Sequence, residues 1–173
     1  MLNRVVLLAC GAIVPLAAPS AVAAQQHDHS APVAPAAHAE VPTDPETERV
    51  AAVLAAYRDA LVGGDAAAME ALFRDDSRVF ENGKAEGSFA QYLAHHLGPE
   101  LDAIVAFTFS DPTILVRVVG PVAFGYETYS YRIALDDGRV IERDGVATSV
   151  LILEEGEWKI AQYHSSSRAP RPS

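Results

Sequence analysis

The sequence predicts an α+β domain in which the helices come first and the antiparallel strands follow. Apolar side chains recur at helical spacing from Val50 to Leu61, whereas the last third of the chain largely alternates apolar and polar residues. An Asp137-Gly138 pair between two alternating runs signals a hairpin. We therefore expect helices that cover one face of a single antiparallel sheet.

Residues 1–24 have the features of a cleaved export signal. Arg4 supplies the positive charge, the apolar run from Val5 to Leu16 is too short to span a bilayer, and the small residues from Ser20 to Ala24 offer a cleavage site. Cleavage removes Cys10, the only cysteine, whose sequence context gives a lipoprotein anchor as the minor alternative. We expect a periplasmic or secreted protein without disulfides.

Three further segments follow the signal. Residues 25–42 are rich in His, Ala and Pro without an apolar period, so we expect a disordered leader, in which His27 and His29 could contact a metal ion. The folded domain is expected at residues 43–168, followed by a short tail at residues 169–173.

Composition limits the partners. The formal net charge of −10 repels phosphate backbones, so nucleic acid is not an expected partner. Nothing after residue 24 is apolar for long enough to cross a bilayer, so we expect no membrane contact once the signal is removed.

The helical elements have recognisable ends. Asp44 can cap a first helix with Pro45 in its first position, and Gly63-Gly64 ends that helix. Asp65 can cap a shorter second helix, and Ser88 a third one. The third helix carries Phe89, Tyr92, Leu93, His96 and Leu97 on one face and is expected to end at Gly98-Pro99.

The strands are short runs separated by turn residues. Ser77 to Glu81 reads as a strand that Asn82-Gly83 turns. The later strands are expected at residues 104–109, 113–119, 122–135, 139–153 and 157–168.

The last of these strands indicates a pocket. Alternation places Trp158, Ile160, Gln162, His164, Ser166 and Arg168 on one face, which begins apolar and becomes polar. A core face changes in this way where a packed interior opens into a cavity. We therefore expect His164 to face the cavity, with Trp158, Gln162 and Ser166 as ligand-binding neighbours.

Two stretches resemble a known superfamily. The runs Tyr57 to Leu61, Gly64-Asp65 and Ala71 to Ser77, together with the ending from Trp158 to Arg168, resemble the ketosteroid isomerase and SnoaL-like families of the nuclear transport factor 2-like superfamily. The resemblance implies a cone-shaped α+β barrel, in which a curved antiparallel sheet encloses a pocket that the first helix closes. It also implies a homodimer formed through the sheet.

The same resemblance suggests catalytic roles. Tyr57 falls where the isomerases carry an oxyanion donor, and Glu81 falls where they carry the aspartate that moves the proton. Such chemistry needs a carboxylate base beside a hydroxyl donor in a dry pocket. The second oxyanion donor falls near Thr148 or Ser149, whose hydroxyl is a weaker donor than the protonated aspartate of the isomerases.

From the residues alone, each candidate has a structural alternative. Tyr57 lies on an apolar helix face, where a buried, hydrogen-bonded side chain explains it as well as ligand contact does. His96 also lies on such a face, where a hydrogen-bonded core histidine is the commoner explanation. Glu81 shares a side of its strand with Val79 but lies beside a turn, where exposure is ordinary. His164 could move a proton or be a structural histidine. One face of the strand at residues 122–135 carries Glu127, Tyr129 and Tyr131. The sequence pattern does not show whether this face is directed toward the pocket or away from it.

Three functions remain open. The first is binding of a small, partly apolar molecule, and the second is an enzyme that abstracts a proton next to a carbonyl, with Tyr57, Glu81 and His164. The third is a dimerisation or protein-interaction module with a filled pocket. No cofactor is expected. A metal site formed by Glu81, His96 and His164 is a minor option, because adjacent His95 and His96 diverge by roughly 100° on a helix and no close-spaced ligand motif supports it.

Overall fold

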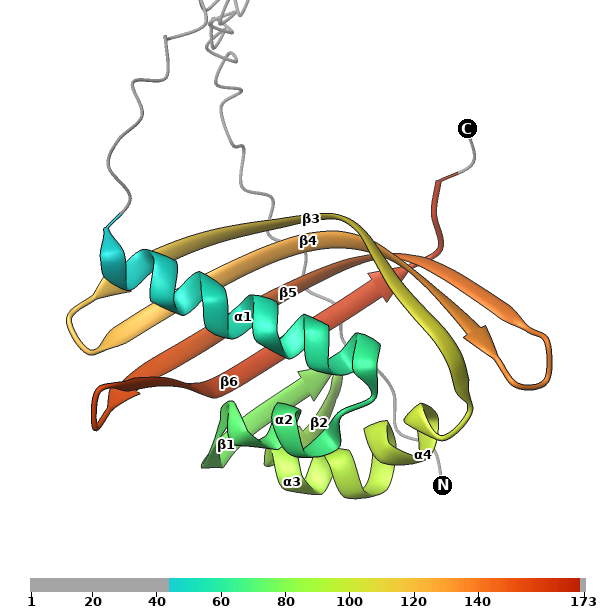
Figure 1. Cartoon of the computed structure of the whole chain (residues 1–173), viewed down its shortest axis with the longest axis horizontal. Helices are drawn as coiled ribbons and strands as arrows, with labels where there is room; N and C mark the ends of the chain where they lie inside the picture. Colours follow the sequence, from blue (N-terminus) through green and yellow to red (C-terminus); the bar gives the residue numbers. More distant parts are fainter. Residues whose placement is uncertain (1–43, 172–173) are drawn as a thin grey trace, which may run out of the picture. The chain divides into compact units, whose positions relative to one another are not determined.

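The computed structural model describes residues 44–171 (Figure 1), all within the unit Glu40–Ser173. The predicted signal, leader and leader histidines lie outside the described residues and stay predictions. Within the described residues, a curved six-stranded sheet is covered on its concave side by the long helix α1, and the short helices gather at one end. The predicted α+β architecture is confirmed.

The caps anticipated from the sequence form the first two helices. Helix α1, Pro45–Gly63, begins at Asp44, whose side chain accepts from the Glu46 amide, and ends at Gly64 in the left-handed conformation. Helix α2, Ala66–Ala71, begins at Asp65, whose side chain accepts from the Ala68 amide at 2.9 Å.

The third predicted helix is three helical segments in series. Helix α3, Phe89–Tyr92, starts with a Ser88 and Gln91 capping box. It continues as a π-helix, η1, Leu93–Leu97, and then as helix α4, Gly98–Leu101. The expected end at Gly98-Pro99 is wrong by a few residues, because proline is tolerated in the first turn of α4.

The strands are β1 Phe73–Glu81, β2 Lys84–Gly87, β3 Ile104–Val119, β4 Val122–Leu135, β5 Val140–Glu154 and β6 Glu157–Arg168. Their order is β2-β1-β6-β5-β4-β3. Neighbours pair antiparallel except β1 and β6, which pair parallel, so the expected antiparallel sheet is mixed. The sheet is open, with β2 and β3 at its edges, and does not close into a barrel.

Strand β3 joins two segments that the sequence suggested as separate strands. The break expected between residues 109 and 113 is a register shift around Asp111, whose φ is 51°, and the strand continues beyond it. A bulge of this kind bends the strand without ending it. In Figure 1, β3 follows the whole arch of the sheet.

A bulge in β6 reverses the predicted faces of the last strand. Ile160 pairs with Leu151 and Gln162 with Val150, so Ala161 is an extra residue without a partner. Because one extra residue shifts the side-chain alternation, the residues after Ala161 exchange faces. Trp158 and Ile160 are buried as predicted, but Tyr163 is then buried and His164 is exposed.

The core lies between α1 and the concave face of the sheet. Val50, Leu54 and Tyr57 of α1 are buried there against residues such as Leu151 and Ile160. Close to these, Phe73 stacks on Phe89 at 3.9 Å between ring centroids, and Tyr57 meets Phe73, Phe89 and Tyr163 edge to face. Beside this packing, space remains toward the end of the sheet near η1 and α4.

Candidate functional site

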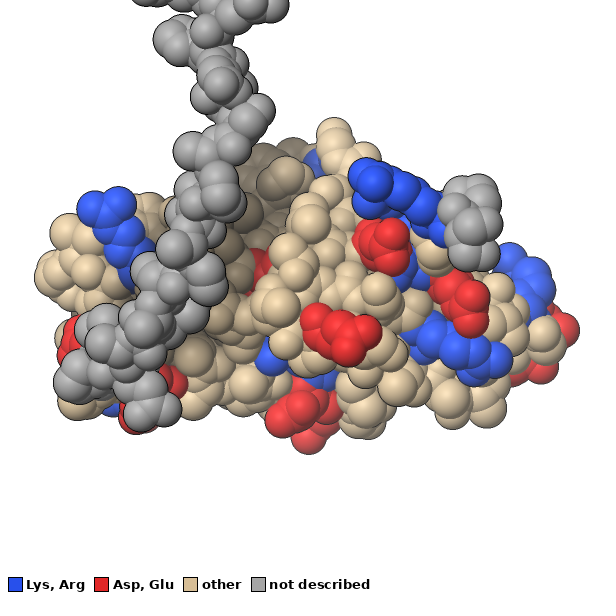
Figure 2. Space-filling model, turned by 90° about the horizontal axis from the view of Figure 1, so that it is seen from above, with Lys and Arg blue, Asp and Glu red and all other residues tan. Residues whose placement is uncertain are grey.

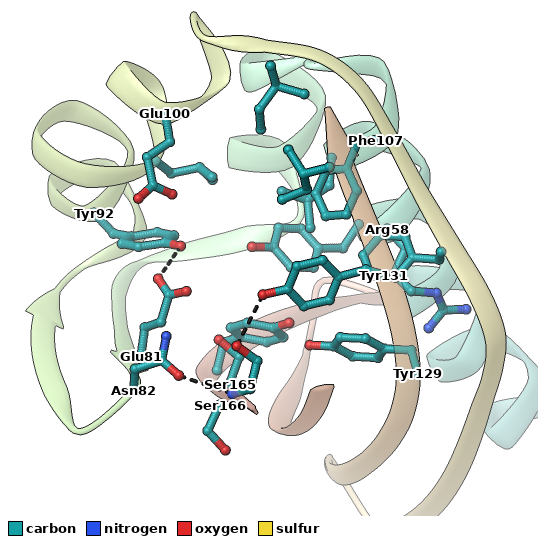
Figure 3. Close-up of a pocket in the computed structure, with 18 residues that line it drawn as sticks. Arg58, Glu81, Asn82, Tyr92, Glu100, Phe107, Tyr129, Tyr131, Ser165 and Ser166 are labelled. Atoms are coloured by element: carbon teal, nitrogen blue, oxygen red, sulfur yellow. Dashed lines mark hydrogen bonds between the residues drawn. The ribbon is translucent and has the colours of Figure 1, made fainter. Parts of the chain in front are cut away.

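A cavity of about 110 Å³ opens beside this aromatic core (Figure 3). One wall is apolar and comes mainly from β3, with Ile104, Phe107 and Phe109. The remaining wall is polar and includes Glu81, Asn82 and the run Ser165-Ser166-Ser167. The lining therefore suits a molecule with an apolar side and a side that forms hydrogen bonds.

Five tyrosines line the cavity: Tyr57 from α1, Tyr92 from α3, Tyr129 and Tyr131 from β4, and Tyr163 from β6. Figure 3 shows the hydroxyls of Tyr92, Tyr129 and Tyr131 directed toward its middle. Burial raises the pKa of Tyr57, Tyr92 and Tyr163 well above 10, and it raises the pKa of Tyr129 to about 12. These phenols therefore keep their protons at neutral pH and can donate hydrogen bonds.

Glu81 is held at the cavity by Tyr92. The Tyr92 hydroxyl donates to Oε2 of Glu81 at 2.6 Å, a short charge-assisted bond (Figure 3). The negative charge of Glu81 also contributes to the raised pKa of Tyr57 and Tyr129. The structure thus brings the predicted pair Tyr57 and Glu81 to one cavity, a convergence that the sequence could only suggest.

A second carboxylate lies under α1. Glu127 of β4 is 4 % exposed and forms an ion pair with Arg58, whose side chain borders the cavity. Burial raises the pKa of Glu127, although Arg58 opposes that rise. The pair joins α1 to the sheet at the cavity wall.

Small residues keep the sheet side of the cavity open. Ala147 and Ser165 lie between Glu127 and Glu81 in one row across the strands. In the next row Gly145 lies under the ring of Tyr129, which a Cβ atom at Gly145 would overlap. Ser167 is fixed by its amide to Asn82 Oδ1 at 3.0 Å and by Tyr131, whose hydroxyl donates to its Oγ at 3.1 Å.

Only part of the predicted site lies around the cavity. Tyr57, Glu81 and Ser166 line it, as expected. His164 and Gln162 do not, because the bulge at Ala161 turns both to the outer face, where they are exposed. Our expectation that the His164 imidazole faces the cavity is wrong.

Trp158 and the proposed second oxyanion donor also lie elsewhere. Trp158 is buried near the start of α1, where its Nε1 donates to Glu46 Oε2 at 2.8 Å. Thr148 is exposed on the outer face, and Ser149 is buried without a hydrogen-bond partner but does not line the cavity. Neither hydroxyl fills the role of a second donor.

His96 does not line the cavity but lies behind Glu81. Its Nδ1 is 3.0 Å from Glu86 Oε1 and 3.8 Å from Glu81 Oε2. Its Nε2 is 3.3 Å from Glu100 Oε1. The ring is therefore surrounded by carboxylates that the sequence pattern did not bring together.

The sequence pattern does not identify Tyr92 and Tyr163 as cavity residues. Tyr92 is one member of an apolar helix face, and the predicted alternation of β6 puts Tyr163 on the face opposite Trp158. Tyr129 and Tyr131 were grouped correctly, but their side was undecided. Tyrosines on the apolar faces of α1 and α3, together with Tyr129 and Tyr131 on one face of β4, are the signal that could indicate a donor-rich pocket.

Comparison with known proteins identifies the family. A sequence profile of the SnoaL-like domain matches residues 50–170. The chain belongs to the SnoaL-like domain family. No curated protein sequence matches the chain.

Solved structures share the fold of this SnoaL-like domain. A ketosteroid isomerase-like protein from Erwinia carotovora atroseptica SCRI1043 aligns with a TM-score of 0.65 at 21% identity, covering 74% of this chain and 100% of that protein. A nuclear transport factor 2-like superfamily protein from Salmonella enterica serovar Typhimurium LT2 aligns with a TM-score of 0.65 at 16% identity. The alignment covers 73% of this chain and 93% of that protein. At these identities the likeness establishes the fold.

No helix within residues 44–171 combines the length and the apolar character that a membrane crossing needs. The same residues contain no group of three or more His, Cys, Asp or Glu side chains placed to hold a metal ion.

Proposed function

We propose that this SnoaL-like domain binds a small, partly apolar molecule that presents a hydrogen-bond acceptor, such as a carbonyl, to the tyrosine hydroxyls. The observation that carries the proposal is the cavity itself, with protonated phenols on one side and Phe107 and Phe109 on the other. Its open volume of about 110 Å³ argues against an interaction module whose pocket is filled by its own side chains.

Native mass spectrometry of the protein from its own host tests this proposal. The expected result is a retained small molecule that is lost in Ser165→Phe, which fills the cavity from β6. Thr148→Phe adds the same ring on the outer face and should retain the molecule. Equal retention in both variants would place the ligand outside the cavity.

A second candidate is proton abstraction next to a carbonyl. It is favoured by one observation, that the Glu81 carboxylate and the Tyr57 phenol border the same cavity. Glu81 would take the proton, while Tyr57 stabilises the oxyanion that develops on the carbonyl. His164 has no part in this scheme because it is on the outer face.

Exchange of α-protons tests the second candidate without a known substrate. A panel of small cyclic ketones in D₂O is followed by proton NMR with and without the protein. Exchange of at least one ketone is expected, with loss in Glu81→Gln and a decrease of about 10²–10³-fold in Tyr57→Phe. If no ketone exchanges faster than in buffer, binding without turnover remains.

We also propose a homodimer formed through the outer face of the sheet. One row across five strands, Leu115, Tyr126, Thr148, His164 and Phe80, carries no acidic or basic group other than the imidazole. Leu115 is 68% exposed and Tyr126 46%, an apolar exposure that monomers seldom keep. On the face seen in Figure 2, acidic and basic side chains lie in small, mixed groups separated by uncharged surface.

Sedimentation velocity tests the dimer. The unmodified protein should sediment as a dimer, and Leu115→Glu or Tyr126→Glu as a monomer, because the carboxylates would be buried without partners. Val62→Glu changes an exposed apolar residue of α1 and should leave the dimer intact.

We further propose that the domain works in the periplasm or outside the cell, because residues 1–24 have the sequence features of an export signal. N-terminal sequencing of the protein from host cell fractions tests this. The expected result is a processed chain that begins near Gln25 in the periplasmic or external fraction.

A further inference from the structure

Three carboxylates from different elements surround one imidazole at the back of the cavity. Glu81 ends β1, Glu86 lies in β2 and Glu100 in α4, and His96 of η1 lies between them. Like charges repel, so such a group is stable only where a cation or shared protons compensate. His96 is the residue in contact with all three.

Glu86 anchors this cluster. Its side chain has no exposed surface, yet it lies within 3.0 Å of Lys84 Nζ and His96 Nδ1, and within 3.4 Å of His95 Nε2. Burial acts to raise the pKa of Glu86, but the hydrogen bonds and charges of Lys84 and His96 outweigh it, so the pKa is lowered. Glu86 is therefore a buried carboxylate that holds the ring.

Both ring nitrogens of His96 face acceptors. Nδ1 approaches Glu86 and Nε2 approaches Glu100, and ionised carboxylates can only accept. The ring is thus fixed from two sides. It also packs edge to face on Tyr92, with 5.2 Å between ring centroids, and Tyr92 is the residue that donates to Glu81.

The two histidines that contact Glu86 lie in the π-helix η1. The Gly98 amide bonds the Leu93 carbonyl, five residues back, and a Cβ at residue 98 would come within 2.6 Å of that oxygen. Within this wider turn, His95 and His96 both lie within 3.4 Å of Glu86. Such π-turns are rare and concentrate at functional sites.

We propose that His96 is a positioning residue for Glu81: anchored on Glu86, it holds the Glu81 carboxylate and its Tyr92 partner in the orientation that the cavity ligand meets. The inference rests on the proposed role of Glu81 in that cavity. The charged and titratable groups around the ring are Glu81 from β1, Lys84 and Glu86 from β2, Tyr92 from α3, His95 from η1 and Glu100 from α4.

His95 is the matched control. It contacts Glu86 at 3.4 Å, as His96 does at 3.0 Å, but the structure gives it no contact with Glu81 or Glu100. Substitution of either histidine should change the surroundings of the Glu86 carboxylate. Only substitution of His96 should change the surroundings of the Glu81 carboxylate.

Carbon-13 NMR of glutamate carboxyl groups, in the full ligand-free protein at pH 7, makes this distinction. The Glu81 and Glu86 signals are assigned by their loss in Glu81→Gln and Glu86→Gln. His96→Phe should shift both signals, and His95→Phe should shift that of Glu86 alone. His96→Asn, whose amide can occupy the place of Nδ1 and donate to Glu86, should return the Glu81 signal toward its original position.

Two results would overturn the proposal: an unmoved Glu81 signal in His96→Phe, or an equal shift of that signal in His95→Phe. If His96→Phe fails to fold, His96→Gln takes its place, because its amide reaches toward Glu100 and leaves Glu86 without the donor. Because the carboxyl signals are measured in the ligand-free protein, they test the positioning role of His96 even if the protein exchanges the protons of no ketone. If one does exchange, His96→Phe should lower kcat and leave KM nearly unchanged.

Discussion

The two faces of the same sheet carry different kinds of side chain. The concave face carries polar side chains that are paired with one another, and the outer face carries large apolar and aromatic side chains that are exposed. On the concave face, Glu127 is paired with Arg58, Glu81 with Tyr92 and Tyr131 with Ser167. On the outer face, Leu115, Tyr126 and Val146 remain about half exposed or more. The difference teaches that alternation along each strand, and where it is interrupted, decides which residues can take part in chemistry.

Insertion of one alanine between Gln162 and Tyr163 is the largest expected disruption of this division. The added residue would turn Tyr163, Ser165 and Ser167 outward and bring His164 inward, which removes an aromatic side chain from the core. We expect a loss of about 4–5 kcal/mol or complete failure to fold. Urea unfolding followed by circular dichroism measures the loss, and insertion of one alanine after Ala169, beyond the strand, should change little.

Adjacent substitutions in β6 separate the two faces directly. Tyr163→Ala empties a buried position among Tyr57 and Phe73 and should cost about 3–5 kcal/mol. His164→Ala, on the outer face, should change the unfolding free energy of the monomer by less than about 0.5 kcal/mol. Similar losses at both positions in urea unfolding would contradict the assignment of faces.

Alkaline pH should weaken the concave face through Tyr129. Its pKa of about 12 in the folded protein exceeds the ordinary value of about 10, so the unfolded chain loses this proton first. The stability is complete below pH 10 and declines as the pH rises toward 12, by about 3 kcal/mol for this group. Urea unfolding from pH 8 to 12 measures the decline, and Tyr129→Phe should reduce it.

Gly145→Ala should have the smallest effect on the concave face. The new methyl group would overlap the ring of Tyr129, which must move toward the cavity, at a cost of about 1–3 kcal/mol. Val146→Ala, one residue along and on the outer face, should cost less. Thermal unfolding compares the two, and equal stability would mean that the Tyr129 ring moves aside freely.

Local signals anticipated much of the fold. The caps at Asp44, Asp65 and Ser88, and the Asp137-Gly138 turn, lie where the sequence indicated them. Each depends on side chains within a few residues of the backbone groups they satisfy. The small strand β2 and the parallel pairing of β1 with β6 were not anticipated, because they depend on partners far along the chain.

The site was anticipated in part for the same reason. Tyr57 and Glu81 were found through a family resemblance together with their local pattern, and both border the cavity. His164 was misplaced because a bulge has no signature in a strand of otherwise regular alternation. The surroundings of His96 were invisible in the sequence, since Glu81, Glu86 and Glu100 come from three separate elements.

By itself, the sequence determined the helix ends, most of the strands, the acidic charge and the membership of an α+β fold, because these follow from periodicity and short-range hydrogen bonding. Only the tertiary structure decided which face of β6 is inside, which tyrosines share a cavity and which carboxylates surround His96. Those outcomes depend on register between strands, and a single unpaired residue such as Ala161 changes register without changing the local pattern.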